Sequence, residues 1–106
     1  MITALQIRAG KTLAETAGQA MYSKIGERDA CGFGWVDVFV DRTNSLQAKE
    51  LIAAGFRKDY KPKCLSMWDP AGLPTQSVSV KEAGAEAYAT YLRALGLNAY
   101  AGSRLD

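Results

Sequence analysis

Residues 34–41 read GWVDVFVD, and β-branched or aromatic side chains occupy five of these eight positions. This composition favours a β-strand over a helix. Successive side chains of a strand point to opposite faces, so the three valines suit a side that packs on helices. The other side then carries Trp35, Asp37 and Phe39.

Further strands are predicted along the rest of the chain. Residues 56–60 and 64–68 flank Lys61-Pro62-Lys63, and proline suits a short hairpin connection because it fixes its own backbone angle φ. Residues 97–101 form a final short strand.

Three helices are predicted from their start signals. In each, a small polar residue is followed three positions later by Glu or Gln, an arrangement that satisfies two unpaired amides at a helix start. The pairs are Thr12 with Glu15, Asn44 with Gln47, and Ser79 with Glu82. Each segment continues with apolar residues at helical spacing and ends at a glycine that suits a left-handed cap. These glycines are Gly26, Gly55 and Gly96.

The order after residue 32 is strand, helix, strand, strand, helix, strand, which is typical of the ferredoxin-like fold. We therefore expect an α+β protein with a ferredoxin-like βαββαβ antiparallel sheet and an additional N-terminal helix. The chain has 106 residues, enough for one core. We expect a single domain, with residues 1–30 as a helical extension and residues 31–106 as the α+β core.

Alternation along the predicted strands gathers aromatic side chains on the sheet face that the two core helices leave open. They are Trp35, Phe39, Trp68 and Tyr100. Large exposed apolar patches usually mark interfaces. One interpretation is that the N-terminal helix folds across this face through its alanines. A second is a stacking platform for single-stranded nucleic acid, and a third is a homodimer that buries two such faces.

Basic residues gather in the predicted hairpin, although the whole chain carries a net charge of only +2. The hairpin cations are Arg57, Lys58, Lys61 and Lys63. They are a candidate binding patch for phosphates or for an acidic partner. No apolar run could span a bilayer and no signal-peptide pattern is visible, so we expect a soluble cytoplasmic protein without a membrane partner.

Catalytic chemistry has little support in the sequence. The chain contains no histidine, which removes the commonest general base and metal ligand. Cys31 and Cys64 are too far apart in sequence for a standard zinc pair, and we expect free thiols. We expect no metal and no cofactor. Cys31 could act as a nucleophile only if a lysine, an arginine or a helix N-terminus activated it.

An anion site is the other catalytic alternative. The irregular segment 69–78 leads into a predicted helix start, where free amides and the helix dipole attract anions. Hydroxyl and amide groups there could add further donors. The candidate residues are Thr75, Gln76, Ser77 and Ser79. The competing interpretation is that these residues serve only as caps and turns.

Four short stretches carry a resemblance. They are CGFGWV at 31–36, LSMWDP at 65–70, VKEAGA at 80–85 and AYAGSRLD at 99–106. Together they resemble small uncharacterised proteins encoded by tailed bacteriophages, over residues 31–106. The resemblance implies an infected bacterial cell as the setting, and hence the host cytoplasm.

Small phage proteins of this size are often inhibitors or adaptors, so the resemblance favours a binding module over an enzyme. The leading hypothesis is a noncatalytic accessory protein that binds a protein partner through residues 69–78 or through the basic hairpin. Single-stranded nucleic-acid binding on the open sheet face and a small enzyme with an anion site at residues 69–79 remain the alternatives.

Overall fold

Helices and strands alternate along most of the chain in the computed structural model, which describes residues 1–26 and 28–106. The elements are α1 (Ala4–Ile25), β1 (Gly32–Phe39), α2 (Leu46–Ala53), β2 (Arg57–Lys58), β3 (Cys64–Trp68), α3 (Val78–Ala94) and β4 (Asn98–Leu105). The strands form one antiparallel sheet in the order β2-β3-β1-β4. The predicted α+β class and antiparallel sheet are therefore confirmed.

The strand bounds differ from the prediction except in β3, which spans residues 64–68 as expected. β1 begins at Gly32, and β4 extends to Leu105, because these two strands pair over eight residues. β2 is reduced to Arg57 and Lys58. β1 starts earlier and β4 ends later than predicted because the two strands pair with each other along their whole length. β2 is shorter than predicted because only two of its residues are in register with β3.

The predicted helix starts are wrong, although the glycines at the helix ends are confirmed. The capping residues are Thr3, Ser45 and Ser77 in place of Thr12, Asn44 and Ser79. Thr3 forms a full capping box with Gln6, so α1 is already helical before the predicted start. Backbone φ angles of 62° at Gly26, 111° at Gly55 and 102° at Gly96 lie in the region that favours glycine.

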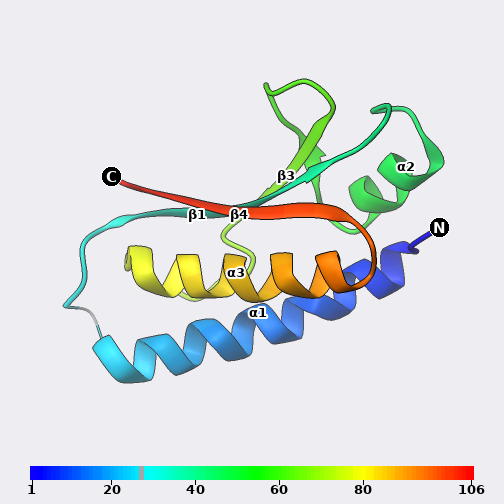
Figure 1. Cartoon of the computed structure of the whole chain (residues 1–106). Helices are drawn as coiled ribbons and strands as arrows, with labels where there is room; N and C mark the ends of the chain where they lie inside the picture. Colours follow the sequence, from blue (N-terminus) through cyan, green and yellow to red (C-terminus); the bar gives the residue numbers. More distant parts are fainter. Residues whose placement is uncertain (27) are drawn as a thin grey trace.

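Figure 1 shows α3 lying between the sheet and α1. The expectation that the N-terminal helix covers the aromatic side of the sheet is therefore wrong. α1 buries a stripe of mostly small residues against α3, and the stripe consists of Ile7, Gly10, Ala14 and Gly18. A Cβ atom on Gly10 would lie 2.6 Å from the ring of Tyr91 and 2.7 Å from that of Tyr88. Helix-on-helix packing this close decides where α1 lies.

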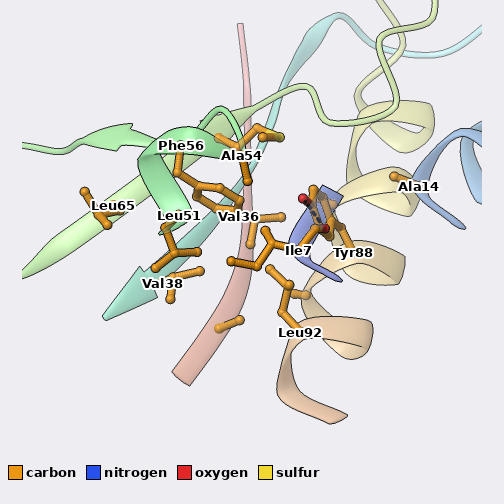
Figure 2. Close-up of a cluster of buried hydrophobic side chains, with 14 of the residues drawn as sticks. Ile7, Ala14, Val36, Val38, Leu51, Ala54, Phe56, Leu65, Tyr88 and Leu92 are labelled. Atoms are coloured by element: carbon orange, nitrogen blue, oxygen red, sulfur yellow. Dashed lines mark hydrogen bonds between the residues drawn. The ribbon is translucent and has the colours of Figure 1, made fainter. Parts of the chain in front are cut away.

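The buried core joins all three helices to one face of the sheet (Figure 2). Val36 and Val38 of β1 point into it, as predicted, and meet Leu51 of α2, Tyr88 of α3 and Ile7 of α1. No helix in residues 1–26 and 28–106 is long and apolar enough to cross a membrane. Since the helices share one side of the sheet, the opposite side is left uncovered by them.

Candidate functional site

The open face, defined here as the side of the sheet opposite the helices, brings together the aromatic residues predicted from the sequence. In the register of the strands, Trp35 lies opposite Trp68, and Asp37 lies between Ser66 and Tyr100. The face carries Arg57, Cys64, Ser66 and Trp68 from β2 and β3, Phe33, Trp35, Asp37 and Phe39 from β1, and Tyr100 and Arg104 from β4.

One end of the open face is a cluster of aromatic rings around Trp68. The indoles of Trp35 and Trp68 stack with ring centroids 4.8 Å apart and planes inclined by 24°, and Phe33 meets Trp68 edge-on at 5.8 Å. The guanidinium carbon of Arg104 lies 5.3 Å from the Phe33 centroid and 5.9 Å from the Trp68 centroid. Trp68 remains 48% exposed, so part of its ring is available to a ligand.

Glycine at position 102 makes room for Trp35. A Cβ atom there would lie 2.5 Å from Cε2 of the Trp35 indole. The indole therefore lies directly over the backbone of β4, which only a residue without a side chain permits.

A second aromatic pair lies at the other end of the open face. Phe39 and Tyr100 meet edge-on with centroids 6.1 Å apart, and Tyr100 is 52% exposed. Two partly exposed rings, Trp68 and Tyr100, thus stand on different strands of one surface.

A buried carboxylate separates the two aromatic ends. Asp37 accepts hydrogen bonds of 2.6 Å from Ser66 Oγ and 2.6 Å from Lys61 Nζ, and a longer one of 3.3 Å from Trp35 Nε1. The hydrogen bond to Asp37, together with the charges of Asp37 and Asp59, raises the pKa of Lys61. The Asp37 carboxylate at the centre of the open face is therefore satisfied by an ion pair and by further hydrogen bonds.

The same centre contains the groups that a metal ion would need, but a lysine occupies it. Oxygen atoms of Asp37 and Asp59 and the sulfur of Cys64 lie within 4.8 Å of one another. Lys61 Nζ lies 2.6 Å from the first carboxylate and 3.6 Å from the second. Burial raises the pKa of the Cys64 thiol, which disfavours the thiolate that a metal binds. The ammonium group of Lys61 thus occupies the position that a metal ion would take between the two carboxylates.

The predicted basic hairpin is split by this arrangement. Lys61 is the one hairpin cation that forms an ion pair within the described residues. The other three are exposed. Arg57 lies opposite Ser66 in the sheet, so it belongs to the open face. A hollow of about 390 Å³ lies between β2 and the Trp68 end of β3, and Arg57 and Lys58 line it.

The predicted anion site is occupied by the chain's own carboxylate. Asp29 Oδ2 accepts a 2.6 Å bond from Ser77 Oγ and a 2.8 Å bond from the Ser79 amide at the start of α3. These bonds lower the pKa of Asp29 to about 2. Thr75 Oγ1 accepts from the Ser77 amide, and the Gln76 carbonyl accepts from an amide of β1. The place of an external anion is taken by Asp29.

The segment 69–78 is partly buried beneath α1. Pro70 and Ala71 are buried, and a Cβ atom on Gly18 of α1 would lie 3.0 Å from Cβ of Ala71. A partner that docks on this segment could therefore not contact Pro70 or Ala71, whereas Gly72, Pro74 and Gln76 are exposed.

Cys31 and Cys64 lie at opposite ends of β1. Cys31 precedes the first residue of β1, and Cys64 pairs with the last, Phe39. At about 3.3 Å per residue the two thiols stand about 26 Å apart, too far for a disulfide bond within one chain. Both are free, Cys31 exposed and Cys64 buried.

Two residues of the open face were missed in the sequence. Phe33 precedes Trp35 by two positions and Arg104 follows Tyr100 by four, so the same alternation would have found both. The predicted first strand began too late to include Phe33, and the predicted last strand ended too early to include Arg104.

Comparison of the chain with family models, with curated proteins and with solved structures gave no match.

Proposed function

We propose that the protein is a noncatalytic binding module that holds single-stranded nucleic acid on the open face of its sheet. The observation that carries the proposal is the pair of half-exposed rings, Trp68 and Tyr100, on a face that no helix covers. Aromatic side chains on a sheet surface stack on bases of any sequence.

Charge around the open face supports the same ligand. Arg57 and Arg104 lie on this face, and Lys58 and Lys63 belong to the hairpin at its β2–β3 end. None of the four forms an ion pair among the described residues. The acidic side chains on this face, Asp37 and Asp59, are both engaged by Lys61. Phosphates approaching the rings would therefore meet positive charge that is not already neutralised.

Arg104 connects the two kinds of contact. Its guanidinium lies beside the rings of Phe33 and Trp68, so it can face a phosphate while it stays stacked. An arginine held in this way loses little freedom when it binds.

The two sites at which a small ion could bind are both filled by side chains of the chain itself, and this supports a noncatalytic role. The helix start of α3 is occupied by Asp29, and the carboxylate centre by Lys61. A protein partner, the leading hypothesis from the sequence, has weaker support because residues 70 and 71 of the 69–78 loop are buried.

We further infer that the strands with α2 and α3 form the ferredoxin-like βαββαβ arrangement, to which α1 is added. The strand order β2-β3-β1-β4, with a helix between β1 and β2 and another between β3 and β4, supports this inference. The resemblance of residues 31–106 to phage-encoded proteins would imply the cytoplasm of an infected bacterium as the setting, and this stays a prediction.

Binding of fluorescein-labelled oligothymidine and oligouridine, measured by anisotropy across a series of salt concentrations, tests the proposal. Affinity should fall steeply with salt, and Trp68→Ala should weaken it by about 1–3 kcal/mol through lost stacking. The matched control is Leu13→Ala, because Leu13 is 47% exposed on α1, away from the sheet.

Absence of binding at low salt, or binding that Trp68→Ala leaves unchanged, would reject nucleic acid as the ligand of this face. Quenching of Trp68 fluorescence by a neutral quencher shows separately whether the ring is accessible. An accessible ring without oligonucleotide binding would return the search to a protein partner.

A further inference from the structure

β4 is an edge of the sheet and presents main-chain groups without a partner strand. Its eight residues pair with β1 alone among the described residues. Successive residues of a strand direct their N–H and C=O groups to opposite edges. The N–H of Asp106 bonds to the Cys31 carbonyl on the β1 side, so the groups of Ala101 and Ser103 point away from β1. Another strand can pair with them.

The free part of this edge has a definite limit. The Ala99 N–H bonds to the Leu97 carbonyl at 3.1 Å, and the Ala99 carbonyl accepts a 2.9 Å bond from Nη1 of Arg93. Both outward groups of Ala99 are therefore satisfied inside the chain. The outward main-chain groups that stay unpaired belong to Ala101, Ser103 and Leu105, and the first two flank Gly102.

Devices that normally protect a sheet edge are missing from this stretch. Residues 98–105 contain neither proline nor lysine, and the three central residues are small. The one charged side chain, Arg104, lies over the rings of Phe33 and Trp68. An edge this accessible is suited to pairing.

We propose that two copies of this chain pair antiparallel through β4, about a two-fold axis at Gly102. A two-fold interface brings one patch against itself, so the patch must be self-complementary. In this register Ala101 lies opposite Ser103 of the second copy. The two equivalent pairs make four main-chain hydrogen bonds and leave those of Ala99 intact.

Side chains on the open face fit the same register. Tyr100, which is 52% exposed, comes to lie opposite Arg104 of the second copy, so an aromatic ring faces the aliphatic stem of an arginine and no like charges meet. Gly102 faces Gly102 of the second copy at the axis, where larger side chains from the two copies would collide.

Charge on α3 favours a second copy over an unrelated strand. Glu82 accepts a 2.6 Å bond from Ser103, and Arg93 donates to Ala99, so α3 places an acidic group near one end of β4 and a basic group near the other. Antiparallel pairing reverses this order in the second copy. Each Glu82 then lies diagonally across from Arg93 of the other copy.

This pairing goes beyond the proposed function and does not depend on it, because no ligand enters the argument. It would join two open faces side by side into one surface.

Sedimentation equilibrium of the full chain, together with amide hydrogen exchange at low and high protein concentration, tests the pairing. Ala101→Pro and Ser103→Pro each remove an outward N–H without removing a bond to β1, as edge strands tolerate. Lys58→Ala, at the opposite edge of the sheet, is the control.

We expect the mass to rise from 11.4 kDa to twice that value with concentration. The Ala101 and Ser103 amides should become protected in parallel, and each proline variant should weaken dimerisation about tenfold or more because two hydrogen bonds are lost per dimer. The Lys58→Ala variant should dimerise like the unaltered chain.

A mass of one chain at every concentration would overturn the proposal. So would a dimer in which the two amides exchange as fast as in dilute solution, for example one that buries Trp68 between two open faces. The hydrogen-exchange measurement uses the unaltered chain, so it tests the β4 pairing even if a proline variant fails to fold. Neither measurement contains oligonucleotide, so its failure is distinct from failure of the proposed function.

Discussion

The hydroxyl of Tyr88 in α3 donates a 2.8 Å hydrogen bond to the main-chain carbonyl of Ile7 in α1. This bond joins residues 81 positions apart and lies in the core. Together with the close contact at Gly10, it holds α1 on α3 and so keeps the open face clear of the helix.

Replacing Tyr88 with phenylalanine should lower the free energy of unfolding by about 1 kcal/mol, because the variant loses one buried hydrogen bond. Burial raises the pKa of Tyr88 above its ordinary value, so the native state keeps a proton that the unfolded chain releases. This contribution is complete below the unfolded pKa of about 10 and is lost as pH rises above it. Urea unfolding at neutral and alkaline pH should therefore show a steeper alkaline loss for the unaltered chain than for Tyr88→Phe. Equal slopes would contradict the assignment.

Gly102→Ala should displace the Trp35 indole, since the new Cβ would lie 2.5 Å from the ring. We expect a loss of about 1–3 kcal/mol in the free energy of unfolding from overpacking, and a changed tryptophan emission spectrum as the Trp35–Trp68 stack separates. Asn98→Ala, an exposed change on the same strand, is the control. An unchanged spectrum in Gly102→Ala would show that the stack does not depend on this glycine.

The parts of this structure that local chemistry determines could be predicted from the sequence. Alternation within residues 34–40 placed Val36 and Val38 in the core and Trp35 on the open face, because strand geometry fixes side-chain direction whatever the neighbours are. Gly55 and Gly96 could be predicted as helix ends because a positive φ angle destabilises a residue that carries a side chain.

The parts of the structure that depend on residues far apart in the sequence could not be predicted. Asp29 reaches the start of α3 from 50 positions away, and no local signal reveals that it takes the place of an anion. Lys61 meets Asp37 across 24 positions, which removes one charge from the predicted basic patch. The side on which α1 packs depends on the fit of Gly10 to two tyrosine rings, and the spacing of small residues alone does not name their partner.

Asp29→Asn should destabilise the protein at neutral pH and flatten its acid sensitivity. Hydrogen bonds from Ser77 and Ser79 lower the pKa of Asp29 to about 2. A lowered pKa contributes stability above the unfolded value of about 3.9, and this contribution is lost as pH falls toward 2. Thermal melts between neutral and strongly acidic pH should converge for the two proteins at the acid end. Asp41→Asn, an exposed carboxylate, should leave the curve unchanged, and parallel curves for Asp29→Asn would refute the linkage.

Lys61 and Lys63 should differ in what their loss affects, although both belong to the basic hairpin. Lys61→Met removes the ammonium 2.6 Å from the buried Asp37 carboxylate, so it should lower the free energy of unfolding by about 1–3 kcal/mol, and Asp37→Asn in the same chain should recover part of that loss. Because its charge is already cancelled, Lys61→Met should barely change the salt dependence of oligonucleotide binding. Lys63→Met, at an exposed cation without an ion pair among the described residues, should leave stability unchanged and reduce the logarithmic salt slope by about 0.7. If Lys61→Met reduced the slope as much as Lys63→Met, the central ion pair would have to open on binding, and the division between a structural and a ligand-binding lysine would fail.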